Sequence, residues 1–144
     1  ILFSYSNADN GGRLINQKIE EFCRSNLSKF KVVKNLGRLS YLSAMKYVDL
    51  LIGNTSSGII EAASFEKPVV NIGSRQLGRL RGVNVIDCNI KDLDKSIALA
   101  LSSDFVSKCK NKVNIYGDGY SSKRIVEELT VHPLSVVKKF IDLK

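Results

Sequence analysis

Short apolar runs alternate with amphipathic helical segments along most of the chain, and this alternation limits the possible folds more than any other feature of the sequence. Strands are expected at residues 1–6, 30–36, 49–52, 68–72 and 83–87, and helices at residues 12–27, 40–47, 57–65 and 90–101. Strands that are separated by helices pair in parallel, because each helix carries the chain back across the sheet before the next strand begins. The pattern therefore predicts an α/β fold, with a parallel sheet and helices on both of its faces.

The helical period weakens after the last of these helices and returns beyond a turn at residues 116–119. Two more helices are expected there, at residues 121–129 and 134–143. We therefore expect a domain over residues 1–118 and C-terminal helices within residues 119–144, which pack on that domain or on a further one. Because the sequence starts within an expected strand and has no initiator methionine, we also expect it to be part of a longer protein.

The net charge of +8 makes nucleic acid a partner to consider. The lysines, however, are spread along the whole chain, and the sequence has no RNP-type aromatic pair, no GXXG loop in a suitable setting and no zinc finger. A solvated basic surface explains this charge better than a nucleic-acid site does. A basic nucleic-acid-binding module nevertheless stays open as an alternative.

Cysteines, histidine and apolar runs limit the location and the chemistry of the protein. Cys23, Cys88 and Cys109 are widely spaced, as expected for reduced structural thiols, and the single histidine, His132, excludes a multi-histidine metal site. No apolar run approaches the roughly 20 residues needed to cross a bilayer. No export signal precedes the first expected strand. We expect a cytoplasmic protein without a bound metal ion.

The stretch Leu50–Ala63 predicts a strand, a tight turn and a helix in immediate succession. Gly53 and Gly58 allow the backbone to turn sharply and to approach a ligand. Hydroxyl groups that can cap the helix follow the strand at Thr55, Ser56 and Ser57. The free amides of the helix start can bind a phosphate, and Glu61, about one turn further on, can accept hydrogen bonds from ribose hydroxyls. The stretch thus suits a nucleotide site, while ordinary helix capping by the same residues remains the alternative.

Three loops rich in glycine and small polar residues are expected at the carboxyl ends of strands, at residues 7–13, 53–57 and 73–82. Ligands of parallel α/β sheets bind outside these carboxyl ends. The third loop carries three arginines, whereas the first lacks the GxGxxG spacing of a dinucleotide site. The shared position of the three loops is the main argument, from the residues alone, for a binding site.

Four motifs follow one another at consistent spacing over nearly the whole chain. They are N-A-D-x-G-G-R at residues 7–13, G-N-T-S-S-G-I-I-E-A at residues 53–62, P-V-V-N-I-G-x-R-Q-x-G-R at residues 68–79 and Y-G-D-G at residues 116–119. This order resembles the C-terminal half of the hydrolysing UDP-N-acetylglucosamine 2-epimerases. The resemblance implies a Rossmann-like domain, one of two that are arranged as in the GT-B glycosyltransferases, with the nucleotide held mainly by the C-terminal one.

The resemblance also implies a UDP site made from several segments of this chain. The diphosphate would be held at the helix start by Thr55, Ser56, Ser57 and Gly58. Glu61 would bind the ribose hydroxyls, and Arg75 would face the phosphates or the reacting sugar as a catalytic residue. The uracil would contact the backbone of Leu36 and Gly37, with Tyr41 against its face.

Members of the family eliminate UDP across C1 and C2 of the sugar without a cofactor and then add water with inversion at C2. Their products serve the synthesis of sialic-acid-like nonulosonates in bacterial surface glycans. The elimination needs a base for the C2 proton and positive charge or amide donors for the leaving diphosphate, and this chain offers only the second. The acid and base groups come largely from the N-terminal domain, and family members are commonly oligomers. We therefore expect the chain alone to be inactive and to need that domain as its partner.

The donor-nucleotide domain of a GT-B glycosyltransferase is the main alternative function, because it would share the central helix and the ribose-binding glutamate. Such a domain would not be expected to carry the motif of residues 73–79 in this form. The sequence leaves open which UDP-sugar is used, and whether Arg38, Arg79 and Arg81 contact phosphate.

Overall fold

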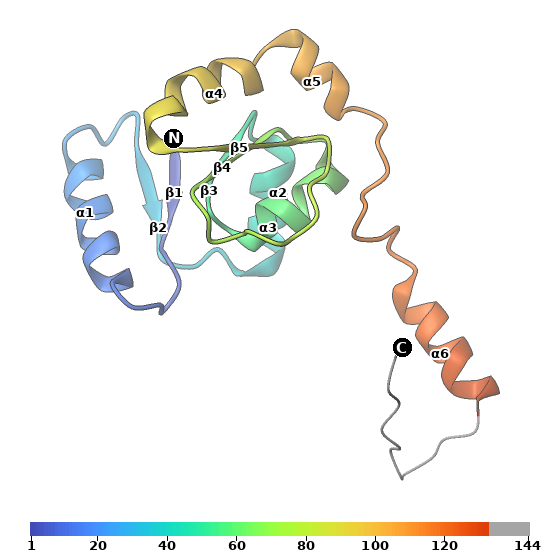
Figure 1. The fold of residues 1–144 in the computed structure, drawn as a ribbon. Helices are drawn as coiled ribbons and strands as arrows, with labels where there is room; N and C mark the ends of the chain where they lie inside the picture. Colours follow the sequence, from blue (N-terminus) through green and yellow to red (C-terminus); the bar gives the residue numbers. More distant parts are fainter. Residues whose placement is uncertain (133–144) are drawn as a thin grey trace. The chain divides into compact units, whose positions relative to one another are not determined.

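The computed structural model describes residues 1–132 and divides the chain into two compact units, Ile1–Val48 and Asp49–Lys144 (Figure 1). They are named unit 1 and unit 2. Both contain parallel strands flanked by helices, which confirms the expected α/β class and its Rossmann-like character. The helix that the sequence predicts at residues 134–143 lies outside the described residues.

Unit 1 contains two strands and two helices, in the order β1 (Leu2–Ser4), α1 (Gly12–Arg24), β2 (Lys31–Val33) and α2 (Gly37–Tyr47). The strands β1 and β2 pair in parallel, with Phe3 opposite Val32. Helix α1 packs on β2, and the ring of Phe22 lies 4.8 Å from that of Phe30 and 6.1 Å from that of Phe3. Edge-to-face and tilted ring contacts of this kind fix the helix against the two strands.

Unit 2 is built around a three-stranded parallel sheet with the strand order β3-β4-β5. Its elements follow one another as β3 (Leu51–Gly53), α3 (Ser56–Ile60), the 3-10 helix η1 (Ala62–Phe65), β4 (Val69–Ile72), β5 (Val85–Cys88), the 3-10 helix η2 (Ile90–Asp92), α4 (Leu93–Ala100), α5 (Ser103–Cys109) and α6 (Ser121–Val131). Helices α3 and α4 both contact the central strand β4, and Figure 1 shows them on opposite sides of the sheet. The sheet is therefore covered on both faces, as expected.

The central strand β4 is buried because its sequence suits a covered strand. Pro68 has no N–H to donate and stands directly before the strand, where its carbonyl accepts a hydrogen bond from the Leu51 amide at 3.0 Å. Val69 and Val70 point to opposite faces of the sheet and are 3% and 0% exposed. The core of unit 2 thus lies on both faces of β4. Ile59 of α3, which is 1% exposed, is part of the core on the face that α3 covers.

The prediction of one continuous helix over residues 57–65 is wrong. The α-helix α3 has five residues, and the chain then tightens into the 3-10 helix η1. The Ile60 carbonyl accepts a hydrogen bond from the Asn114 side chain at 2.7 Å, whereas the Ser64 amide, its α-helical partner by spacing, donates to the Glu61 carbonyl instead. An i to i+3 pattern of this kind is the usual ending of a short helix.

Helix α5 was not predicted, because the hydrophobic period is weak between Asp104 and Asn114. Its start is capped by Ser102, whose Oγ accepts a hydrogen bond from the Phe105 amide at 3.2 Å. The cap and the burial of Cys109, which is 2% exposed, stabilise a helix of two turns. None of the helices described is long and apolar enough to cross a membrane.

An exposed ion pair joins Asp118, which precedes α6, to Arg124 in the first turn of that helix. Asp118 accepts hydrogen bonds from Arg124 and from the Tyr120 amide, and these contacts lower its pKa to about 2. Because the folded pKa is below the ordinary value of 3.8, the pair contributes to stability at neutral pH, and this contribution is lost as the pH falls from about 4 through about 2.

Replacing Arg124 by alanine is expected to raise the pKa of Asp118 toward 3.8, since its main hydrogen-bond donor is removed. A carboxyl NMR titration measures this pKa directly. Lys123→Ala is the control, because Lys123 pairs with Glu127 at 3.8 Å and not with Asp118. An unchanged pKa of Asp118 in Arg124→Ala would show that the ion pair does not form in solution.

Candidate functional site

The turn between β3 and α3 has the conformation of a capped helix start, as predicted. Thr55 is the N-cap residue, and its Oγ1 accepts a hydrogen bond from the Ser57 amide at 3.3 Å. Ser56 is the first residue of the helix. Gly58 is buried against β4, where a Cβ would lie 3.1 Å from Cγ1 of Val69. The missing side chain lets α3 approach the sheet closely.

Glu61 lies at the end of α3, as its C-cap residue, and is half-buried. Its Oε2 accepts a hydrogen bond from the Ser57 hydroxyl, one helical turn earlier. Within residues 1–132, no donor reaches its Oε1. The carboxylate is therefore held beside the helix start, with one oxygen available to accept a further hydrogen bond.

The second and third loops of the predicted site meet at the backbone carbonyl of Asn54. This oxygen accepts hydrogen bonds from Arg75 Nη1 at 3.2 Å and from Gln76 Nε2 at 2.7 Å. The two loops lie together because they follow β3 and β4, which are neighbours in the sheet. Their predicted proximity is confirmed, whereas that of the loop at residues 7–13, which belongs to unit 1, stays a prediction.

Gln76 is part of this arrangement, although the sequence analysis gave it no role. Its side chain is 2% exposed, which is unusual for a glutamine on a loop. Because Nε2 must face the Asn54 carbonyl, the amide cannot be flipped, and Oε1 finds no donor within the described residues. Only its place beside Arg75 in the motif of residues 68–79 could have drawn attention to it.

The residues predicted to contact the uracil lie in unit 1, at the start of α2. Leu36 is the N-cap residue, Gly37 has a left-handed φ of +63°, and half-buried Tyr41 lies one turn further along the helix. The Gly37 amide already donates to Asn35 Oδ1 at 2.7 Å. Gly37 is also the first residue of α2, so its carbonyl is an acceptor within the helix by the i to i+4 pattern.

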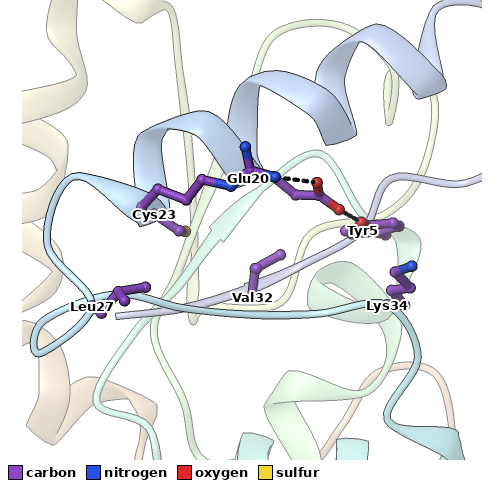
Figure 2. A pocket seen from close by; sticks show the side chains of 7 residues that line it. Tyr5, Glu20, Cys23, Leu27, Val32 and Lys34 are labelled. Carbon is purple, nitrogen blue, oxygen red and sulfur yellow. Dashed lines mark hydrogen bonds and ion pairs between the residues drawn. The ribbon is translucent and has the colours of Figure 1, made fainter.

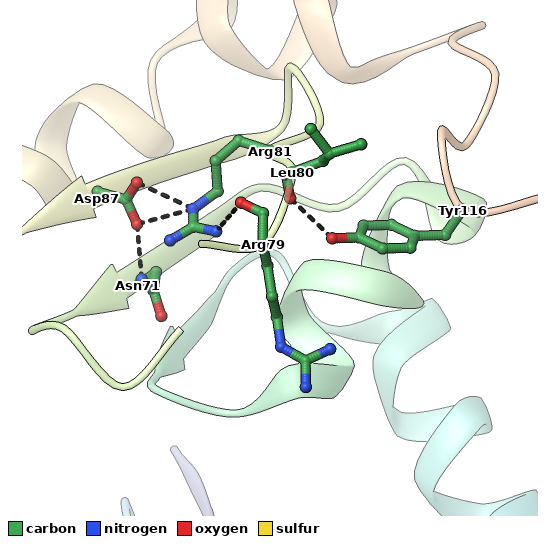
Figure 3. Close-up of polar contacts among 6 residues, drawn as sticks. All are labelled: Asn71, Arg79, Leu80, Arg81, Asp87 and Tyr116. Carbon is green, nitrogen blue, oxygen red and sulfur yellow. Dashed lines mark hydrogen bonds and ion pairs between the residues drawn. The ribbon is translucent and has the colours of Figure 1, made fainter. Parts of the chain in front are cut away.

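A polar network joins the loop at residues 73–82, which we call the arginine-rich loop, to the carboxyl ends of β4 and β5 (Figure 3). Asp87 accepts hydrogen bonds from Arg81 Nε at 3.1 and 2.9 Å and from Asn71 Nδ2 at 2.6 Å. Arg81 Nη1 also donates to the carbonyl of Arg79 at 2.6 Å. Sequence reasoning left the role of Arg81 open; the structure places two of its donor groups on protein acceptors.

The pocket drawn in Figure 2 shares no lining residue with the predicted site and lies in unit 1, between α1 and β2. Its lining residues are Tyr5, Glu20, Cys23, Arg24, Leu27, Val32 and Lys34. Glu20 accepts a hydrogen bond from the Tyr5 hydroxyl and forms an ion pair with Arg24 at 3.5 Å. Across residues 1–132, no group of three or more His, Cys, Asp and Glu side chains could hold a metal ion.

The family model described as UDP-N-acetylglucosamine 2-epimerase matches residues 1–130 of this sequence. The chain belongs to that family. The match covers both glycine-rich loops that meet at Asn54 as well as α1, α2 and most of α6. The resemblance found from four motifs is thus confirmed for nearly the whole sequence.

Three curated proteins that are similar to this chain carry specific names. The chain is 46% identical over 105 residues to a GDP/UDP-N,N'-diacetylbacillosamine 2-epimerase (hydrolyzing) of Campylobacter jejuni, with 73% of the chain covered. It is 40% identical over 129 residues to a UDP-N,N'-diacetylbacillosamine 2-epimerase (hydrolyzing) of Legionella pneumophila, with 89% covered. It is 33% identical over 145 residues to polysialic acid biosynthesis protein P7 of Escherichia coli, with 99% covered.

The chain spans only part of the length of these three relatives. The matched region is 27% of the Campylobacter protein, 33% of the Legionella protein and 34% of the Escherichia coli protein. Most of the length of each relative therefore lies outside the matched region.

Proposed function

We propose that this chain is the UDP-binding C-terminal part of a hydrolysing UDP-sugar 2-epimerase. The substrate would be UDP-N-acetylglucosamine or a 2,4-diacetamido analogue, and the products would be the free manno-configured sugar and UDP. The names of the relatives at 46% and 40% identity support the 2,4-diacetamido analogue. The name of the Escherichia coli relative supports a place in the synthesis of sialic-acid-like sugars.

The observation that carries this proposal is the capped start of α3 with Glu61 held beside it, in a chain of this family. The amides that follow Thr55 would bind the diphosphate with Ser56, Ser57 and Gly58, since a helix start favours anions. The open oxygen of Glu61 would accept hydrogen bonds from the ribose. Arg75, whose loop meets the helix start at Asn54, would face the phosphates.

The remaining contacts to the nucleotide would be those to its uracil. The backbone of Leu36 and Gly37 would meet the uracil, and Tyr41 would lie against its face. Residues 1–118 would form the nucleotide-binding domain in this arrangement. Residues 119–144 would pack on it or on the N-terminal domain of the same enzyme.

The reaction would proceed in two steps. A base removes the proton on C2 while the bond between C1 and the diphosphate oxygen breaks, so that UDP leaves with the bonding electrons and a glycal remains. Water then adds across the double bond, with inversion at C2. The role of this chain would be to stabilise the negative charge that develops on the leaving diphosphate, through the amides of α3 and the guanidinium of Arg75. The base and acid would come from the rest of the enzyme.

Glu61→Ala is expected to weaken UDP binding about 30-fold, because a carboxylate that binds two ribose hydroxyls contributes about 2 kcal/mol. Calorimetric or amide NMR titrations of the chain with UDP, GDP, UMP and ADP measure this affinity and the base preference together. UDP is expected to bind more tightly than ADP. The GDP titration is included because the name of the Campylobacter relative contains both nucleotides.

Glu127→Ala is the matched control, since it removes an exposed carboxylate of unit 2 from α6. It should leave all four affinities unchanged. Equal binding of UDP and ADP that falls with salt and does not depend on Glu61 would mean that a basic surface, not a nucleotide site, binds these anions. That result would overturn the proposed function.

A further inference from the structure

The arginine-rich loop is joined to the sheet through the carboxylate of Asp87. Asp87 stands in β5 directly beside Asn71 of β4 in the parallel register and accepts its amide donor at 2.6 Å. The Arg81 Nε donates to both oxygens of the same carboxylate, to Oδ1 at 3.1 Å and to Oδ2 at 2.9 Å, and Oδ1 is also the acceptor of the Asn71 amide. Arg81 carries the connection on to the loop backbone, through its hydrogen bond to the Arg79 carbonyl at 2.6 Å. Asp87 thus links the rigid sheet to the middle of the loop.

A second side chain holds the next residue of the loop. The Tyr116 hydroxyl donates to the Leu80 carbonyl at 2.9 Å, from a segment that lies 36 residues away in the sequence. Figure 3 shows Arg81 and Tyr116 reaching the loop from different sides, while the side chain of Arg79 points away from Asp87. Two successive carbonyls of the loop are therefore held by side chains. Arg81, from the end of the same loop, holds that of Arg79, and Tyr116, from a distant segment, holds that of Leu80.

The beginning and the end of the loop are fixed as well. Gln76 is tied to the Asn54 carbonyl at its beginning. Gly82, at its end, lies so close to buried Asn84 that a Cβ would be 2.5 Å from the Asn84 Oδ1. Asn84 in turn donates to the Lys67 carbonyl at 2.9 Å. A loop that is fixed at four points loses little conformational entropy when its cationic groups bind a ligand.

We propose that Asp87 and Arg81 are positioning residues, which hold the loop of residues 74–82 so that its guanidinium groups are presented to the diphosphate of the bound nucleotide. The inference rests on the proposed function and goes beyond it by giving the network a role in binding. Arg81 acts through its hydrogen bonds to Asp87 and to the Arg79 carbonyl. Such support is what keeps donor groups within a few tenths of an ångström of their working positions.

Asp87→Asn tests this role, because it keeps the shape of the side chain and removes the charge that pairs with Arg81. The affinities of the chain for UDP and for uridine are measured by NMR titration. UDP binding should weaken about ten-fold, the size of one charge-assisted hydrogen bond, while uridine binding stays the same, since uridine carries no phosphate. Tyr116→Phe should shift the ratio in the same direction and serves as a second variant, because Tyr116 is 37% exposed and its loss does not disturb the core.

Asp118→Asn is the matched control. It also removes a carboxylate that is paired with an arginine of unit 2, but its partner, Arg124, lies on α6 and not in the loop. Its ratio of UDP to uridine affinity should equal that of the wild type. A cycle in which Arg75 and Arg79 are both replaced by alanine then separates positioning from general stabilisation. If Asp87 acts through these two loop arginines, Asp87→Asn should have little further effect on UDP binding in that background.

Three results are distinguishable. A selective and non-additive loss of UDP affinity supports the positioning role. Equal losses for UDP and uridine, or full additivity with the replacement of Arg75 and Arg79, overturn it and leave the proposed nucleotide site intact. A wild-type chain that binds UDP no better than ADP, with no effect of Glu61→Ala, overturns the proposed function and this inference with it.

Discussion

Replacing Gly12 by alanine is expected to lower the free energy of unfolding of unit 1 by about 3 kcal/mol. A Cβ at this position would lie 2.4 Å from the Asn7 carbonyl oxygen and 3.0 Å from the Ser6 hydroxyl oxygen. The backbone cannot yield easily, because the Ser6 amide donates to Asn16 at 2.8 Å and the Gly12 amide donates to the Asp9 carbonyl at 2.9 Å. The substitution must therefore push α1 away from the turn that precedes it.

The protection of Cys23 from alkylation measures the loss of stability in unit 1 separately from unit 2. Cys23 on α1 is 2% exposed, and brief alkylation at increasing denaturant followed by peptide mapping measures when it becomes accessible. Gly11→Asn is the control, since Gly11 has a φ of +84°, no atom within 4 Å of a Cβ and a conformation that asparagine tolerates. Early exposure of Cys23 in Gly11→Asn, but not in Gly12→Ala, would contradict the steric explanation.

Ile59→Ala is expected to destabilise unit 2 by about 3 kcal/mol, because it removes most of a side chain that is 1% exposed and leaves a cavity between α3 and β4. Chemical denaturation measures the loss, and Cys109, which is 2% exposed and whose pKa is raised by burial, serves as the local thiol probe of unit 2. Ile59→Val should cost about 1 kcal/mol, in proportion to the atoms removed.

Ile52→Ala is the matched control for this second prediction. Ile52 is also an isoleucine of unit 2, but it is 49% exposed on β3, so its truncation should change the free energy of unfolding by less than about 1 kcal/mol. Equal losses at both positions would show that α3 does not pack on the sheet as described.

The sequence was sufficient for elements whose signals are local. The β-branched residues after Pro68 predict β4, and Thr55 before an apolar helical run predicts the capped start of α3; both are present. The contact between the second and third loops was also predictable, because the ends of neighbouring parallel strands lie together.

Long-range contacts explain where prediction failed. No local pattern indicates that Asn114 will take the Ile60 carbonyl and shorten α3, because these residues are 54 positions apart. The hydrophobic period of residues 12–27 predicts an inner face that includes Leu14 and Ile15, yet these side chains are 57% and 50% exposed. A periodic pattern shows that a face is apolar but does not identify what covers it.

Most of the residues predicted for the nucleotide site belong to one of the four motifs. Glu61, Ser57 and Arg75 were selected in this way, and the contact of Ser57 with Glu61 follows from their spacing on a helix. Asp87 gave no signal, since a single aspartate near a strand end is ordinary and its importance comes from a register with Asn71 that is known only in the folded sheet. The UDP-contact roles of the motif residues remain predictions.

The segment at residues 111–116 contacts other parts of unit 2 at three separate places, although it contains no helix or strand. The Asn111 amide donates to Glu66, the Asn114 side chain donates to Ile60 and Ser64, and Tyr116 donates to Leu80. This has a practical consequence for evolution and for protein engineering. Insertions and new protease sites should be better tolerated at Gly117 than within residues 111–116, since the side chains and amides of the earlier positions hold the segment against the rest of unit 2.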